Sequence, residues 1–301
     1  MILTIEIGNT NIVFGCVEGD RIAFRGRVHT DRLKTSDQYC IDLKTLLEIY
    51  ECPPEKLEGT VIASVVPQVL NSMQAAVRKL TGRNALVVGP GMKTGLKILL
   101  DNPAQMGADL VAADIAALRE HKPPLIVIDM GTAITMSVLD GSGAHLGGCV
   151  CPGVQLSVDA LTRNTSLLPG IQLDKPEKAI GRNTSDAMRS GIMMGTASLL
   201  DGMIDRFEQE LGQSCSVIIT GGIARFIMPL CRHEMIYDQD LVIKGLAALY
   251  RENCGDRAGI SPFYAIPPER MHPYSVMRKN RMATNPAQLA EHRTVSASLF
   301  M

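Results

Sequence analysis

The chain has 301 residues, of which 46% are hydrophobic and 20% charged, and its formal net charge is −1. That length is sufficient for two domains, each with a buried core. The near-zero charge gives no support for a nucleic-acid partner, and no apolar run reaches the ~18 residues that a membrane span requires.

An apolar strand that ends in an acid and a glycine opens the chain. Residues 1–17 contain this strand, then Glu6, the turn Gly8-Asn9-Thr10 and a second strand, and a third strand follows over 21–28. A buried strand-end carboxylate is costly unless a cation or hydrogen-bond donors satisfy it. The glycine leaves backbone N–H groups accessible, and such groups can hold a phosphate.

Helix and strand patterns alternate over the next part of the chain. The expected elements are a helix over 36–49 after a Ser-Asp cap signal, a strand over 60–66, a helix over 68–80 and a short strand over 85–88. The glycine-rich segment 89–95 fails the spacing of both the Walker loop and the dinucleotide fingerprint, so it is predicted to be a loop. A helix is expected over 108–120. Asp109 falls in its first turn, where the helix dipole alone also favours an acid.

Residues 125–153 repeat the opening pattern. An apolar strand over 125–128 ends in Asp129, followed by Gly131-Thr132, a strand over 133–139 and a third strand that leads to Gly147-Gly148. Asp129 stands 123 positions after Glu6 in a matching context. Two such hairpins predict a duplicated domain with both loops facing a shared cleft, which suits nucleotide phosphates and their metal.

The remaining elements complete the second copy. They are a short helix over 154–161, a long helix over 185–211 capped by Thr184, a strand over 216–220 before Gly221-Gly222, and a helix over 241–253. The strand corresponds to 60–64 of the first copy. Glycines inside the long helix predict close packing against another element; they are Gly191, Gly195 and Gly202. Its acids are predicted to form a solvated face; they are Asp201, Asp205, Glu208 and Glu210.

These boundaries predict domains over 1–121 and 122–255, with an extended or weakly ordered tail over 256–301. The eight cysteines include no CxxC pair, and Cys149-x-Cys151 and Cys231-x-His233 have poor metal-ligand spacings. Cysteines within predicted strands are expected to be small buried hydrophobes. Together with a start that lacks an export signal, they predict the reducing cytoplasm.

In order along the chain, the motifs resemble those of the type III pantothenate kinase family. They are 6–10, 107–110, 128–132, 147–153, 181–184 and 220–222. The resemblance, which ends at about Asn253, implies an α/β fold: two duplicated ribonuclease-H-like domains of the actin-like ATPase and sugar-kinase type, with mixed sheets flanked by helices. It also implies a cytoplasmic homodimer that phosphorylates pantothenate with ATP to 4′-phosphopantothenate, the first step of coenzyme A synthesis, using Mg²⁺ and a monovalent cation, K⁺ or NH₄⁺. Neither nucleic acid nor membrane is an expected partner.

The resemblance also implies site residues. The residues expected to bind ATP are Glu6, Ile7, Gly8, Asn9, Thr10, Asn11, Ile12, Val13 and Thr132. Asp109 is expected to be the base that accepts the hydroxyl proton, Asp129 to bind the monovalent cation and Glu6 to bind the metal. The residues expected to line the pantothenate pocket are Leu100, Gly107, Ala108, Asp109, Leu110 and Thr184.

Three positions depart from the family pattern, which has Asp at Glu6, Arg at Leu110 and Tyr at Leu100. The extra methylene of Glu6 displaces its carboxylate by ~1.5 Å, and Mg²⁺ demands near-ideal octahedral geometry. Leu110 and Leu100 make the pocket less cationic and more apolar. Three hypotheses follow: a pantothenate kinase of normal or reduced rate, a kinase of a less anionic pantoyl alcohol, and a catalytically weak regulatory paralogue, since some relatives are described as transcriptional activators.

Overall fold

The computed structural model describes residues 1–254, so the predicted tail over 256–301 lies outside the described residues. The first sheet has the strand order β3-β2-β1-β4-β5. Its strands are β1 (Ile2–Ile7), β2 (Asn11–Glu18), β3 (Arg21–His29), β4 (Gly59–Ser64) and β5 (Leu86–Val87). β1 is antiparallel to β2 and parallel to β4, and Glu6 lies opposite Val13 and Ala63. The sheet is therefore mixed, as expected.

The second sheet repeats this arrangement with the order β10-β9-β6-β7-β8. Its strands are β6 (Leu125–Met130), β7 (Ala133–Leu139), β8 (His145–Pro152), β9 (Ser216–Thr220) and β10 (Ile236–Tyr237). β6 is antiparallel to β7 and parallel to β9, and Asp129 lies opposite Thr135 and Thr220. Glu6 and Asp129 thus occupy matching places on matching central strands. The short strand β10 was not expected from the sequence.

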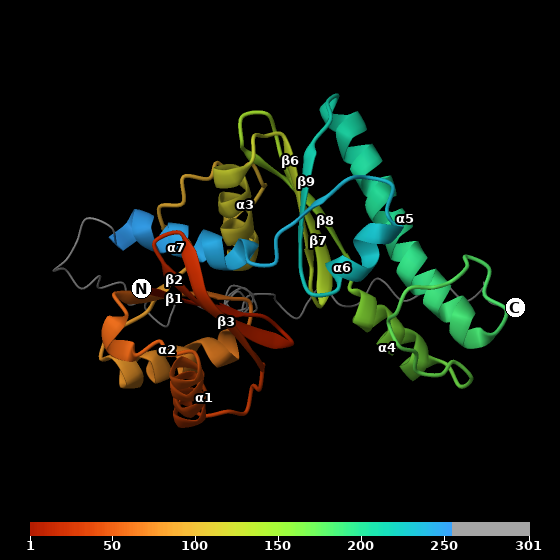
Figure 1. Ribbon diagram of the computed structural model, residues 1–301. Helices are drawn as coiled ribbons and strands as arrows, with labels where there is room; N and C mark the ends of the chain where they lie inside the picture. The colour runs from red at the N-terminus through yellow and green to blue at the C-terminus, as the bar shows by residue number, and fades with distance from the viewer. Residues whose placement is uncertain (255–301) are drawn as a thin grey trace, which may run out of the picture. The chain divides into compact units, whose positions relative to one another are not determined.

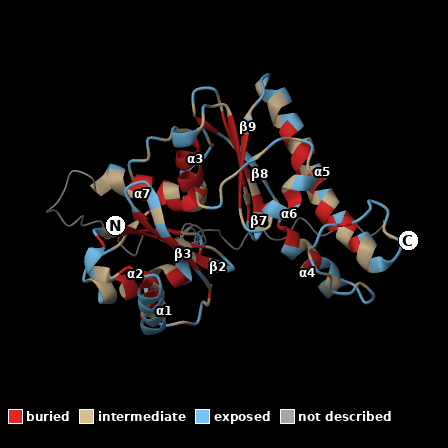
Figure 2. Ribbon diagram, viewed as in Figure 1, coloured by how far each residue is buried: buried red, intermediate tan, exposed pale blue. Residues whose placement is uncertain are grey.

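Helices cover the outer face of each sheet, and both sheets are buried at their centres (Figures 1 and 2). The outer helices are α1 (Ser36–Ile49), α2 (Pro67–Thr81), α4 (Val154–Asn164), α5 (Thr184–Leu211) and the short α6 (Ala224–Ile227). Leu3, Ile5 and Ile7 of β1 pack against α1 and α2. Ile126 and Ile128 of β6 pack against α4 and α5. Single 3-10 turns occur at Pro54–Lys56, Pro103–Gln105 and Met228–Leu230.

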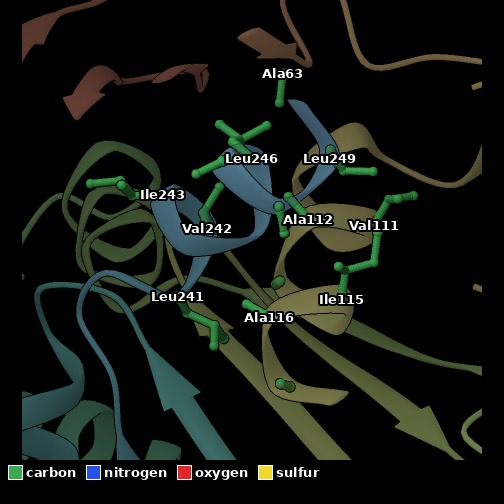
Figure 3. Packing of buried hydrophobic residues seen from close by; sticks show 14 of the residues in the cluster. Ala63, Val111, Ala112, Ile115, Ala116, Leu241, Val242, Ile243, Leu246 and Leu249 are labelled. Carbon is green, nitrogen blue, oxygen red and sulfur yellow. The ribbon is translucent and has the colours of Figure 1, made fainter. Parts of the chain in front are cut away.

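Two further helices, α3 (Ala108–Glu120) and α7 (Leu241–Cys254), form one apolar cluster with the inner faces of both sheets (Figure 3). Gly245 of α7 is in such close contact with the Ala112 carbonyl of α3 that a Cβ would overlap it. α7 comes from the end of the described chain, yet it packs on β1, β2 and β4 of the first sheet. The layer containing α3 and α7 therefore joins the two halves into one compact unit.

The segment 89–95 is a loop, as predicted, and Asn253 of α7 holds it through hydrogen bonds with the backbone of Lys93.

The helix caps of α1 and α5 differ from expectation. Thr35 forms a capping box with Gln38 at α1. Asn183, rather than Thr184, caps α5 by accepting a bond from Asp186 N. In both cases the cap lies one residue before the predicted one.

One expectation about α5 is wrong, and the other holds only in part: Asp205 and Glu210 are exposed as predicted, whereas Asp201 is buried. A Cβ at Gly191 or Gly195 would meet nothing within 4 Å, so these glycines do not mark a close approach to another described element. Asp201 is only 4% exposed, and its carboxylate accepts the backbone N–H groups of Arg232 and His233 at 2.9–3.1 Å. Its burial is possible because those donors replace the lost water.

Candidate functional site

The turn between β1 and β2 is held by its own backbone and by Thr30. Gly8 N donates to Asn11 O at 3.0 Å, and Thr30 N donates to Thr10 O at 2.9 Å. The Thr30 hydroxyl donates to Gly8 O at 2.7 Å and is nearly buried. These bonds fix the loop that follows Glu6. Nothing in the hairpin pattern pointed to Thr30.

The turn between β6 and β7 repeats these bonds. Gly131 N donates to Ala133 O at 3.0 Å, and Gly153 N donates to Thr132 O at 3.1 Å. Gly153 is required at this point, because a Cβ would overlap the carbonyl oxygens of Thr132 and Gly131. The second turn is thus closed over one residue fewer than the first.

The two turns meet. The hydroxyl oxygens of Thr10 and Thr132 lie 2.8 Å apart, although 122 positions separate the residues in the chain. The predicted juxtaposition of the two hairpin loops is therefore present. Both threonines are exposed, so a ligand can reach the junction.

Strand alternation directs the acids into the layer between the sheets. Glu6 shares its face of β1 with Ile2, and Asp129 shares its face of β6 with Leu125 and Val127. Ile2, Leu125 and Val127 belong to the cluster that includes α3 and α7. Both carboxylates therefore point toward the layer where α3 begins.

Asp109 completes the group from the first turn of α3. Gly107 is the N-cap without a side-chain bond, and the Asp109 carboxylate accepts Leu110 N at 2.9 Å. A Cβ at Gly107 would overlap that carboxylate, so the glycine keeps one side of it open. Ala108 and Leu110 are partly buried on either side.

Burial and the charges of neighbouring acids raise the pKa values of Glu6 and Asp129. Burial, then the charges of Asp129 and Asp109, raises the pKa of Glu6 to about 8. Burial and the charge of Asp109 raise the pKa of Asp129 to about 6. Because like charges and desolvation both disfavour ionisation, a cation placed among these groups would be attracted strongly. The residues present therefore fit a cation site.

No three described His, Cys, Asp or Glu side chains converge tightly enough to bind one metal ion by themselves. That is compatible with Mg²⁺ at a phosphoryl-transfer site, because this ion usually takes one or two carboxylates and completes its shell with phosphates and waters.

Two predicted pocket residues lie apart from one another. Leu100 is close to β8: its Cδ2 atom lies 3.6 Å from the place of a Cβ on Gly147. Thr184 is exposed at the start of α5, which packs on the face of the second sheet opposite to that of α3. The structure thus does not bring Thr184 to Asp109 within one chain.

The chain has two matching sheets that are joined through a shared helical layer, and the loops of the two sheets are in contact. A solved structure has the same arrangement. A protein from Sinorhizobium meliloti assigned as a 2-dehydro-3-deoxygalactonokinase superposes with a TM-score of 0.55 at 13% identity, over 83% of this chain and 98% of that one, which shows the fold alone. The chain thus has the fold of the sugar-kinase and actin-like ATPase class, built from duplicated ribonuclease-H-like halves. The model of the type III pantothenate kinase family matches residues 2–206. The chain belongs to the type III pantothenate kinase family.

Named relatives agree over most of the chain. Type III pantothenate kinases from Exiguobacterium sp. and Thermus thermophilus are 38% and 39% identical to it, over 84% of this chain and 99% of each relative. The family phosphorylates pantothenate with ATP at the start of coenzyme A synthesis, so the resemblance inferred from the motifs is confirmed. Within residues 1–254, no helix is long and apolar enough to cross a membrane.

Proposed function

We propose that this chain transfers the terminal phosphoryl group of ATP to the hydroxyl of pantothenate, with Asp109 as the base. One observation carries the assignment: Asp109 lies close enough to Glu6 and Asp129 for its charge to raise the pKa of both, and the two hairpin turns that follow these strand-end acids meet at Thr10 and Thr132. A carboxylate within reach of a primary alcohol takes its proton as the bond to phosphorus forms. The remaining task is alignment and charge stabilisation, which fixed loops and cations supply.

The nucleotide side of the site is assigned to the two turns. Residues 6–13 and Thr132 would hold the triphosphate, and the exposed hydroxyls of Thr10 and Thr132 meet at the junction of the two turns. Glu6 would hold Mg²⁺ and Asp129 a monovalent cation, K⁺ or NH₄⁺. The raised pKa values of both acids support this, since a bound cation would favour their ionised forms. These ions would neutralise charge on the phosphates.

The acceptor side is assigned to Leu100, the first turn of α3 and Thr184. Because α5 packs on the other side of the second sheet, we propose that Thr184 serves the site of a second copy. The edge strand β8 supports a homodimer: Val150 is 72% exposed there, and Leu156 of the adjoining α4 is 47% exposed. A cytoplasmic location also stays a prediction.

Two alternatives are tested together with this proposal. The partly buried Leu100 and Leu110 favour an acceptor that is less anionic than pantothenate, such as pantetheine. Glu6, with its longer side chain, favours reduced activity or a binding role.

The test is a coupled ADP-release assay with pantothenate, Mg²⁺ and K⁺. We expect turnover by the wild type and a loss of about 10²–10⁴-fold in kcat for Asp109→Asn. Asp20→Asn, at the exposed turn between β2 and β3, is the matched control and should keep its rate. Turnover of pantetheine alone would support the less anionic acceptor. ATP binding without turnover of any pantoyl alcohol would overturn the kinase assignment.

A further inference from the structure

A buried Asp–His pair lies behind the site, outside the residues assigned so far. Asp114 of α3 is 0% exposed and His145 of β8 is 3% exposed. His145 Nδ1 and Asp114 Oδ2 are 2.7 Å apart. Because an ionised carboxylate only accepts, this contact places a proton on Nδ1.

Packing and stability alone do not explain why a buried Asp–His pair stands here. Buried ion pairs are often replaced by apolar residues without loss of stability, because taking two charged groups out of water is costly. Asp114 Oδ1 has no hydrogen-bond partner among the described residues, so the carboxylate depends heavily on His145. Burial raises the pKa of Asp114, while the hydrogen bond with His145 opposes that rise.

The two residues hold the two ends of one segment, residues 97–107. At its start, His145 N donates to Lys97 O at 2.8 Å and Leu99 N donates to His145 O at 2.9 Å. At its end the chain enters α3, whose first turn carries Asp109 and whose second carries Asp114. The backbone of His145 thus binds the start of the segment, and the side chain of His145 binds Asp114 in the helix that follows its end.

We propose that Asp114 and His145 are positioning residues that set the acceptor side of the site. Their hydrogen bond fixes the distance between β8 and α3, and so the distance between Leu100 and Asp109. The proposal rests on the acceptor role given above to these two residues.

The selectivity of the effect follows from where the pair attaches. The turns that contain Thr10 and Thr132 are held by their own backbone bonds and by Thr30 and Gly153. Asp114 and His145 make none of those bonds. Breaking the Asp114–His145 hydrogen bond should therefore weaken the binding or alignment of the alcohol substrate, while ATP binding should stay unchanged.

The first measurement is steady-state kinetics with both substrates varied. His145→Leu should raise the pantothenate KM or lower kcat about tenfold or more, because an error of ~1 Å in alignment can cost about a hundredfold. The KM for ATP should stay within about twofold. His145→Asn, whose amide N–H can replace Nδ1–H, should restore most of the lost acceptor efficiency.

A double variant separates positioning from stability. Asp114→Ala with His145→Leu leaves no buried unpaired charge, so its melting temperature should recover relative to His145→Leu alone. The acceptor defect should persist in the double variant. Recovery of the acceptor KM together with the melting temperature, or an equal rise in both KM values, would overturn the proposal.

Hydrogen exchange tests the same pair without turnover. The amides of Leu99 and His145 should exchange faster in His145→Leu and stay protected in His145→Asn, while Gly8 and Gly131 remain unchanged. If the wild type turns over no pantothenate, the proposed function fails, and this result still decides whether the pair holds the segment. Unchanged exchange at Leu99 in His145→Leu would refute the positioning role.

Discussion

The carboxylates of Glu6 and Asp129 lie at the ends of the central strands, where burial and the charges of neighbouring acids oppose their ionisation. A cation-binding carboxylate must be deprotonated, so cation binding here is coupled to proton release. Because the pKa of folded Glu6 is about 8 against an ordinary 4.5, the folded chain holds a proton over that range that the unfolded chain has lost. Stability without a cation therefore falls as pH rises from 4.5 toward 8.

This coupling predicts how Mg²⁺ acts on the melting temperature. In a chelator, the melting temperature should fall between about pH 6.5 and 8.5, and Glu6→Gln should flatten most of that slope. Mg²⁺ should raise the melting temperature more at the upper pH than at the lower, because the carboxylate is then free to bind it. Thermal melts monitored by circular dichroism give the comparison.

Glu55→Gln, at an exposed position in the first half of the chain, is the matched control and should melt like the wild type. A Glu6→Gln variant that keeps both the full slope and the full Mg²⁺ response would show that Glu6 is neither the titrating group nor the metal ligand.

Single residues also mark where sequence reasoning failed. The acids of α5 follow a pattern typical of a solvated face, yet Asp201 is buried beneath the loop at Arg232. Its partners, Arg232 and His233, lie 31 and 32 positions further along the chain, and no local periodicity reports such a pairing. The Asp114–His145 pair went unnoticed for the same reason, since its members are 31 positions apart in unrelated elements.

At the scale of elements, the close packing of α3 against α7 depends on Gly245. Gly245 allows the two helices to approach until a Cβ would overlap the Ala112 carbonyl, and backbone yields less easily than a flexible side chain. The same contact sets where α3 lies, and hence where Asp109 lies.

Gly245→Ala is therefore predicted to destabilise the fold by about 1–3 kcal/mol, as overpacking in a core does, despite the better helix propensity of alanine. Urea unfolding followed by circular dichroism measures the change. Gly170→Ala, where a Cβ would meet nothing within 4 Å, should leave the unfolding free energy nearly unchanged. Equal urea midpoints for the two variants would mean that α3 and α7 can move apart without a loss of unfolding free energy.

Most elements were predictable because the local spacing of apolar residues indicates which positions are buried. The apolar runs of β1 and β6 and the exposed-buried spacing of α1 gave strands and a helix within a residue or two of the observed ends. The caps were displaced because Ser, Thr, Asp and Asn cluster at helix starts and several can cap. Strand β10 is two residues long, too short for any periodicity.

At the scale of the whole molecule, the repeat of the acid-glycine hairpin predicted that Glu6 and Asp129 would face the same region, and they do. The sequence did not predict that α7 would leave the second half and pack on the first sheet. Helix amphipathicity tells which face is buried, but does not say against which partner.

The homodimer proposal gives the prediction at this scale. Val150→Lys, on the exposed edge strand β8, should convert a dimer into a 32.6 kDa monomer in sedimentation velocity, because a charge would be buried in an apolar contact. Ile41→Lys, on α1 and 64% exposed, should remain dimeric. If the site is shared through Thr184, the Val150→Lys monomer should also lose pantothenate turnover. A wild type that sediments as one chain would refute the arrangement.

The turn at Thr10 and the turn at Thr132 close over different numbers of residues, although they belong to matching hairpins and touch one another. Both turns are assigned to ATP, whose triphosphate differs from one end to the other, so two identical turns would not match it. A single chain lets one turn change without the other, whereas in a pair of identical subunits every substitution would alter both turns.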